Sequence, residues 1–155
     1  ACMQPQPPPP TLPAGDVSTI RNVTVTKPDP SEMDHLVTIS TLPADACDQT
    51  AEGKVCSIDT GQVIKWGWGF CEDNEAALQS AVPNAKVELI VDGVKVPPSF
   101  IYERDEVYQR PRHGYCHTWT IKLSNWQIGS SVRLENRAAA GDLRPQSNVF
   151  VMNVN

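Results

Sequence analysis

The sequence predicts an all-β fold, a sandwich of two antiparallel sheets with about eight strands and one short loop helix. Val, Ile and Thr together number 34 of the 155 residues whereas Leu numbers 8, and β-branched side chains suit pleated strands better than helices. Several short segments alternate apolar and polar residues, and turn signals separate them at regular spacing. The length suits one domain and is too short for two of ordinary size.

Charge and hydropathy exclude two classes of partner. The formal net charge is −5 and the isoelectric point is about 5.1, so the chain lacks the basic footprint that binding to nucleic acid or to an anionic membrane surface needs. The longest uninterrupted apolar stretches are a handful of residues, such as those at 149–152, against the roughly 20 of a membrane-spanning helix. We expect no nucleic-acid partner and no membrane span.

Residues 1–15 are predicted to be a proline-rich tether, and residues 16–155 one folded domain. The stretch 4–13 favours polyproline II, a semi-rigid spacer; the alternative is a disordered terminus without a role. Cys2 follows a small residue and precedes this spacer, which resembles the end of a bacterial lipoprotein signal. That resemblance implies lipidation of Cys2, and we expect membrane contact only through this possible anchor.

The first strands are expected at Val17–Thr26, which Pro28 stops, and at Leu36–Leu42. A third strand, Gly61–Cys71, places its bulky apolar residues on one face and Cys71 on the other. Cys116 begins the strand that runs to residue 123, also on the side away from the core.

The cysteine count supports two disulfides. Setting Cys2 aside leaves an even set of four. If the strands that end at Cys71 and begin at Cys116 are antiparallel neighbours, these two thiols lie side by side and form a bridge. Cys47 and Cys56 would then close a small loop. Such disulfides indicate an oxidising, extracytoplasmic compartment. A zinc site is disfavoured because no C-x2-C pair is present.

The middle of the chain carries the strongest local signals. Glu72–Val82 is the one helical stretch, with Asp73 as the predicted N-cap and Pro83 as the stop. Lys86–Val96 is a predicted hairpin because Asp-Gly at 92–93 is a preferred type I′ turn. A turn at these positions would place residue 91 opposite residue 94 and residue 89 opposite residue 96.

The remaining elements complete the sandwich pattern. We expect a short strand at Phe100–Glu103, a polar loop to residue 114, the strand that carries Trp119, a turn at Asn125–Gly129, and strands at Val132–Ala138 and Ser147–Val154. The succession of the V-E-L-I-V-D-G hairpin, W-x-I-x-L, V-x-L-x-N-R-A and S-N-V-F-V-M-N-V resembles the immunoglobulin-like or fibronectin type III-like modules of bacterial surface and secreted proteins. This resemblance covers roughly residues 17–155 and implies an immunoglobulin-like sandwich. The inter-sheet bridge of antibody domains is missing, because no cysteine falls in the penultimate strand.

Aromatic and arginine residues supply the candidate binding sites. Trp66, Trp68 and Trp119 fall in phase with core residues and are expected to pack inside. Trp126 lies in a turn, either exposed to a ligand or packed under the end of the sandwich. The loop that follows residue 101 is rich in Tyr and Arg, which favour recognition interfaces. The predicted binding residues are therefore Tyr102, Arg104, Tyr108, Arg110, Arg112, Tyr115 and Trp126.

The sequence contains no pattern that predicts catalysis. A nucleophile elbow, an HEXXH helix, a P-loop and paired carboxylates are all missing, and neither the His113–His117 pair nor the early acidic residues have metal-binding spacing. We therefore expect no catalytic residue, no cofactor and no metal. The expected function is a monomeric, surface-displayed binding or structural module with a protein or glycan ligand. The alternative is a carbohydrate-binding module that uses exposed aromatic residues.

Overall fold

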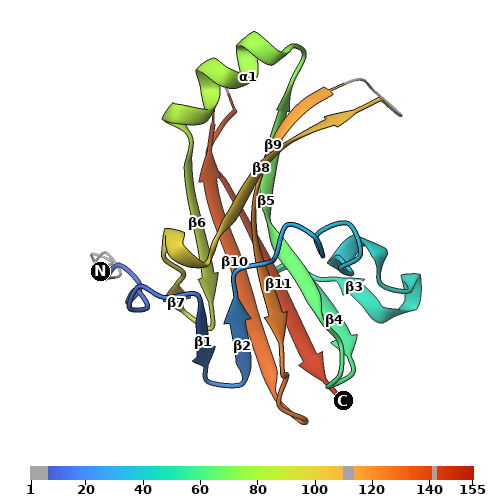
Figure 1. Cartoon of the computed structure of the whole chain (residues 1–155). Coiled ribbons are helices and arrows are strands. Elements are labelled where there is room, and N and C mark those ends of the chain that lie inside the picture. The colour runs from blue at the N-terminus through green and yellow to red at the C-terminus, as the bar shows by residue number, and fades with distance from the viewer. Residues whose placement is uncertain (1–6, 110–113, 141–142) are drawn as a thin grey trace, which may run out of the picture.

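The computed structural model describes residues 7–109, 114–140 and 143–155, whose strands form two sheets (Figure 1). The predicted all-β sandwich is confirmed, with eleven strands among the described residues in place of about eight. The first sheet contains β1 (Val17–Ile20), β2 (Val23–Thr26), β5 (Ile64–Glu72), β8 (Tyr102–Tyr108) and β9 (Gly114–Ser124). The second sheet contains β3 (Cys47–Gln49), β4 (Lys54–Ile58), β6 (Lys86–Val91), β7 (Val94–Lys95), β10 (Ser131–Ala139) and β11 (Gln146–Val154).

The main hydrophobic core lies between the sheets and takes one face of each long strand. In β5, Ile64 and Trp66 are buried, while Lys65 between them points to the outer face and is half-buried. In β10, Val132 and Leu134 are fully buried. This period of two follows from the pleat of a strand, so the alternating pattern in the sequence correctly identified the core side.

One strand pair departs from the predicted antiparallel arrangement. β11 pairs with β4 in parallel, with Phe150 beside Lys54 and Val154 beside Ile58, whereas the other pairs of strands are antiparallel. A short turn forces its two strands to be antiparallel, but no turn joins β4 to β11. The sequence therefore held no local signal for their relative direction.

The predicted first strand, Val17–Thr26, is in fact two strands. β1 and β2 form a hairpin in which Val17 lies opposite Thr26 and Ile20 opposite Val23. The turn places Arg21 in the left-handed region, at φ 50°. It contains no glycine to mark it, so the pattern alone predicted one continuous strand.

The predicted second strand, Leu36–Leu42, is wrong. Val37 forms an isolated bridge to Ile64 of β5, and a 3-10 helix follows at once. The hydroxyl of Thr41 accepts a hydrogen bond from the Thr38 amide at 2.9 Å and donates to the Thr38 carbonyl at 3.0 Å. Side-chain bonds of this kind compete with ladder pairing, so the chain leaves the edge of β5 after one contact. The 3-10 helices of the described residues are η1 (Ile39–Thr41), η2 (Ala44–Ala46), η3 (Val82–Asn84) and η4 (Pro98–Phe100).

The predicted hairpin at β6 and β7 is confirmed in its register. Val91 lies opposite Val94, and the Val96 amide donates to the Leu89 carbonyl at 2.8 Å. The turn residues at positions 92 and 93 have φ angles of 46° and 78°, as a type I′ turn requires.

The predicted helix is also confirmed, but it begins at Glu75 in place of Glu72, which is the last residue of β5, and it has a different cap. Helix α1 (Glu75–Ala81) lies at one end of the molecule (Figure 1). Its N-cap is Asn74, not Asp73, because the Asn74 side-chain oxygen accepts from the Ala77 amide at 2.8 Å. Leu78 is buried in a second apolar cluster that lies under the helix.

Strand β8 is longer than predicted. The sequence suggested a strand at Phe100–Glu103 followed by a polar loop, whereas β8 pairs with β9 from Tyr102 to Tyr108. Consecutive charged residues at 103–106 are typical of a loop. Here each of them finds a polar partner on one face of the β8–β9 hairpin or the other, as described below.

The proline-rich segment contacts the domain near its end. Thr11 forms a parallel bridge to Lys95 of β7, and the backbone of Lys95 bonds to Pro10 and Leu12 at 2.7 and 3.0 Å. Leu12 packs against the main core. The role of residues 1–15 as a tether stays a prediction, and Cys2 lies outside the described residues.

Both predicted disulfides are confirmed. Cys47 and Cys56 are directly opposite on β3 and β4, and Cys71 and Cys116 are directly opposite on β5 and β9. Such bonds persist in oxidising compartments outside the cytoplasm. Among the described residues, no helix has both the length and the apolar character that crossing a membrane requires.

Candidate functional site

Residues 29–41, which we call the crossing segment, run over the outer face of the first sheet. The Glu32 carboxylate accepts a hydrogen bond from Lys122 Nζ at 2.8 Å, and the Asp34 carboxylate accepts one from Arg104 Nη2 at 2.9 Å. The bond from Lys122 lowers the pKa of Glu32, and the bond from Arg104 lowers the pKa of Asp34. These early acidic residues therefore hold the segment to the sheet.

A groove of about 380 Å³ opens beside the crossing segment, and we call it the β5 groove. It lies where the edge of β5 meets the crossing segment on one side and strands β4 and β11 on the other. Its volume falls in the range of small-molecule pockets. The groove is lined by Met33, Thr38, Ile39, Ser40, Lys54, Lys65, Trp66, Gly67, Trp68, Gly69, Glu106, Tyr108, Thr118, Thr120 and Phe150.

The floor of the groove is free of β5 side chains at two alternate positions, because glycine occupies both of them. Gly67 and Gly69 lie opposite Thr120 and Thr118 of β9. A Cβ atom at position 67 would overlap the backbone oxygen of Trp119, so only glycine fits there without movement of the strand. The floor therefore presents backbone together with two threonine side chains.

Two tryptophans of β5 form the aromatic side of the groove. Trp66 is 5% exposed and packs edge to face on Phe150, and its Nε1 atom has no hydrogen-bond partner among the described residues. Trp68 is half-buried, its ring lies tilted at 34° to that of Trp119, and its Nε1 atom donates to Gln146 at 3.4 Å. The prediction of core packing is confirmed for Trp66 and Trp119, whereas Trp68 packs against the core and is also partly exposed.

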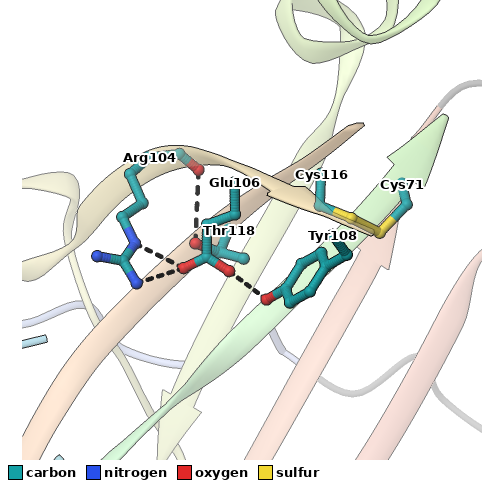
Figure 2. The surroundings of a disulfide bond; sticks show 6 residues. All are labelled: Cys71, Arg104, Glu106, Tyr108, Cys116 and Thr118. Atoms are coloured by element: carbon teal, nitrogen blue, oxygen red, sulfur yellow. Dashed lines mark hydrogen bonds and ion pairs between the residues drawn. A yellow bond between two sulfur atoms is a disulfide. The ribbon is translucent and has the colours of Figure 1, made fainter. Parts of the chain in front are cut away.

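The rim formed by β8 is held by a chain of polar contacts, shown in Figure 2 beside the disulfide that joins β5 to β9. Arg104 Nε donates to Glu106 Oε1 at 2.5 Å, and the Tyr108 hydroxyl donates to Glu106 Oε2. The bond to Glu106 raises the pKa of Tyr108 to about 12, so this phenol stays protonated at neutral pH. Glu106 therefore lines the groove as a carboxylate that is already paired.

The predicted binding residues do not form one patch. Tyr102, Arg104 and Tyr108 alternate along β8 on the outer face of the first sheet, where Tyr108 reaches the β5 groove. Tyr115 lies on the other face of β9 and packs against the apolar cluster under α1. The remaining two, Arg110 and Arg112, lie outside the described residues.

Trp126 is not available as a ligand contact. It is 3% exposed, belongs to the main core, and donates from Nε1 to the Gln62 carbonyl at 2.7 Å. Of the two interpretations left open by the sequence, packing under the end of the sandwich is correct. Its indole N–H finds a backbone acceptor there, which makes burial of this polar group tolerable.

A separate polar cluster joins α1 to the β8–β9 hairpin. His117 Nδ1 lies 2.6 Å from Asp105 Oδ1, and His117 Nε2 lies 2.9 Å from Glu103 Oε1. Gln79 of α1 donates to the same aspartate at 3.1 Å. The bond with His117 is the main cause that lowers the pKa of Asp105. No group of three or more His, Cys, Asp or Glu side chains in the described ranges is placed to hold a metal ion.

Sequence reasoning missed most of the β5 groove. One signal was present: bulky residues alternate with glycine from Trp66 to Phe70, which indicates a strand with one face free of side chains. The positions of Lys54, Ser40 and Thr118 carried no such signal, because strands β4 and β9 and the crossing segment come together only in the folded chain.

The comparisons with known proteins assign no family. No protein-family model matches the sequence, and no curated protein matches it. Among solved structures, the solution structure of amebosin is similar, at 14% sequence identity and a TM-score of 0.35, over 77% of this chain and 98% of that chain.

Proposed function

We propose that this chain is an extracytoplasmic, non-catalytic binding module whose ligand occupies the β5 groove. The two disulfides support an extracytoplasmic location. The groove supports a binding function because its lining comes from both sheets and from the crossing segment, and it combines aromatic faces with a small number of polar groups.

The observation that carries the proposal is that the walls of the groove are held in place by the protein itself. Glu106 is bonded to Arg104 and Tyr108, and Lys65 donates from Nζ to the Met33 carbonyl. Side chains that are already ordered lose little conformational entropy when a ligand binds. Because these bonds fix the Glu106 side chain, its oxygens are also positioned to accept a hydrogen bond from a ligand.

A bulky substitution at the groove mouth tests this proposal. Ser40 is exposed and lines the groove, so Ser40→Trp is expected to fill the mouth and weaken ligand binding at least tenfold without disturbing the core. Binding would be measured by calorimetry with the ligands selected by the wild-type protein from a polysaccharide panel and a displayed peptide library.

The matched control is Ser57→Trp, because Ser57 is exposed on β4 outside the groove. It should bind as the wild type does. If both variants lose the same affinity, or if Ser40→Trp binds the ligand as tightly as the wild type, the ligand does not occupy the groove. Failure of the wild type to bind anything in either panel would contradict a binding function, and mass-spectrometric detection of a converted ligand would contradict the non-catalytic part.

We also propose that the module is displayed on a membrane through a lipid at Cys2, with the proline-rich segment as a spacer. The support is the small residue before Cys2 and the even number of the other cysteines, all four of which are used in disulfides. Intact mass of the membrane-extracted native protein is expected to exceed the polypeptide mass by that of the acyl groups. A mass equal to the polypeptide with an unmodified Cys2 thiol would refute the anchor.

A further inference from the structure

The charge around the β5 groove differs in sign from the charge of the whole protein. The chain has a formal net charge of −5, yet the groove is lined by two lysines, Lys54 and Lys65, and by one carboxylate, Glu106. Glu106 is paired with Arg104, and neither lysine has a carboxylate partner within 4.0 Å among the described residues. The groove therefore favours an anionic ligand.

The uncharged part of the groove suits a sugar ring. Trp68 is partly exposed, and Tyr108 is 47% exposed, so both present aromatic surface against which the apolar face of a ring can pack. Threonine and serine hydroxyls of the crossing segment and of β9 lie around them and can both donate and accept hydrogen bonds.

The edge of β5 is poorly suited to the main alternative, an added peptide strand. Strand addition needs a run of free backbone groups along the edge. The Lys65 amide already donates to the Val37 carbonyl at 2.9 Å, and the Gly67 carbonyl already accepts from Asn136 Nδ2 at 3.2 Å. These two bonds interrupt the edge where a peptide would have to pair.

We infer that the β5 groove binds an acidic oligosaccharide, with a sugar carboxylate beside Lys54 and Lys65 and a ring against Trp68. This inference rests on the proposed function and names the ligand class of the same groove. The volume of about 380 Å³ lies near the lower end for ligand pockets, so the groove takes a short segment of the chain of sugars.

The test compares charged and uncharged forms of the same sugars. Tetramers of galacturonate and of mannuronate, and a hyaluronan tetramer, would be titrated into the full chain, each alongside its methyl ester, with Trp fluorescence and calorimetry as readouts. At least one acid form is expected to bind at least tenfold more tightly than its ester. Lys54→Gln is expected to weaken the affinity for the acid form about tenfold, since one charge-assisted hydrogen bond is lost, and to leave the affinity for the ester unchanged.

The control variant is Lys86→Gln, because Lys86 is exposed on β6 and does not line the groove. It should bind as the wild type does. Equal binding of acid and ester, an effect of Lys86→Gln as large as that of Lys54→Gln, or binding of peptides alone would overturn the acidic-sugar inference while the binding function stands. If none of these sugars and none of the peptides binds, both proposals fail.

Discussion

Replacing Cys71 and Cys116 together by alanine is expected to lower the free energy of unfolding by about 4 kcal/mol. The two cysteines are 45 positions apart in the sequence, and the chain-entropy model assigns about 4 kcal/mol to the closure of a loop of this length. The total stability of a domain of this size is only about 5–15 kcal/mol, so this loss is between about a quarter and four-fifths of the total.

The second disulfide supplies the comparison that isolates loop length. Cys47 and Cys56 are 9 positions apart, for which the same model gives about 2.6 kcal/mol. Each pair buries one sulfur deeply, at Cys56 and at Cys116, so the packing loss should be similar in the two double-alanine variants. The difference of about 1.4 kcal/mol then reports the difference in loop closure.

Urea unfolding of the oxidised wild type and of both variants would measure these losses. A larger loss for the Cys47 and Cys56 variant than for the Cys71 and Cys116 variant would contradict the entropic account. It would indicate instead that the small β3–β4 unit depends on its disulfide for packing against β11.

Gly67→Ala is expected to lower the free energy of unfolding by about 3 kcal/mol, the upper part of the usual range for overpacking. The added Cβ would overlap the backbone oxygen of Trp119 and lie 2.8 Å from its carbonyl carbon and 3.0 Å from Thr120 Cα. These are backbone atoms of β9, so no side-chain rotation can relieve the overlap. The gain of about 0.4–1 kcal/mol from a stiffer unfolded chain is smaller than this cost.

Alanine substitutions at two other glycines provide a comparison for this loss of stability. At Gly61 an added Cβ meets nothing within 4 Å, so Gly61→Ala should change stability by no more than about 0.5 kcal/mol. At Gly69 an added Cβ would lie 2.9 Å from the Thr118 methyl group, which can rotate away, and 3.0 Å from the His117 backbone oxygen, which cannot, so Gly69→Ala should fall between the two. Thermal and urea unfolding of the three variants would rank them. If Gly67→Ala proves as stable as Gly61→Ala, β5 and β9 can separate at little cost.

Predictions from the sequence were most accurate where the deciding residues are neighbours in the chain. The Asp-Gly turn at 92–93 set the register of β6 and β7, and the alternation in β5 placed Trp66 on the core side. The same alternation, extended to Cys71 and Cys116, identified their disulfide and left Cys47 and Cys56 as the second pair. The helix was correct except that it begins at Glu75 in place of Glu72 and that Asn74 takes the cap position.

Predictions failed where a side chain could pair with something far away. The charged residues of β8 resembled a loop because the sequence does not show that Arg104 meets Asp34 of the crossing segment, 70 positions away. Trp126 could be exposed or buried until the Gln62 carbonyl was known to lie beside its indole nitrogen. The strand predicted at Leu36–Leu42 failed for a local reason instead, because hydroxyl bonds between Thr38 and Thr41 replace pairing with β5.

By itself, then, the amino-acid order determined an all-β sandwich, its inward faces, the β6–β7 hairpin and its disulfide pairs, because each of these depends on strand periodicity and on turn residues a few positions apart. The tertiary structure alone decided the parallel pairing of β4 with β11 and the position of the crossing segment. It thereby created the β5 groove, whose walls are held by contacts such as the ion pair between Glu32 and Lys122, 90 positions apart. Contacts of that range leave no periodic trace in a sequence, because no turn or repeat connects the two partners.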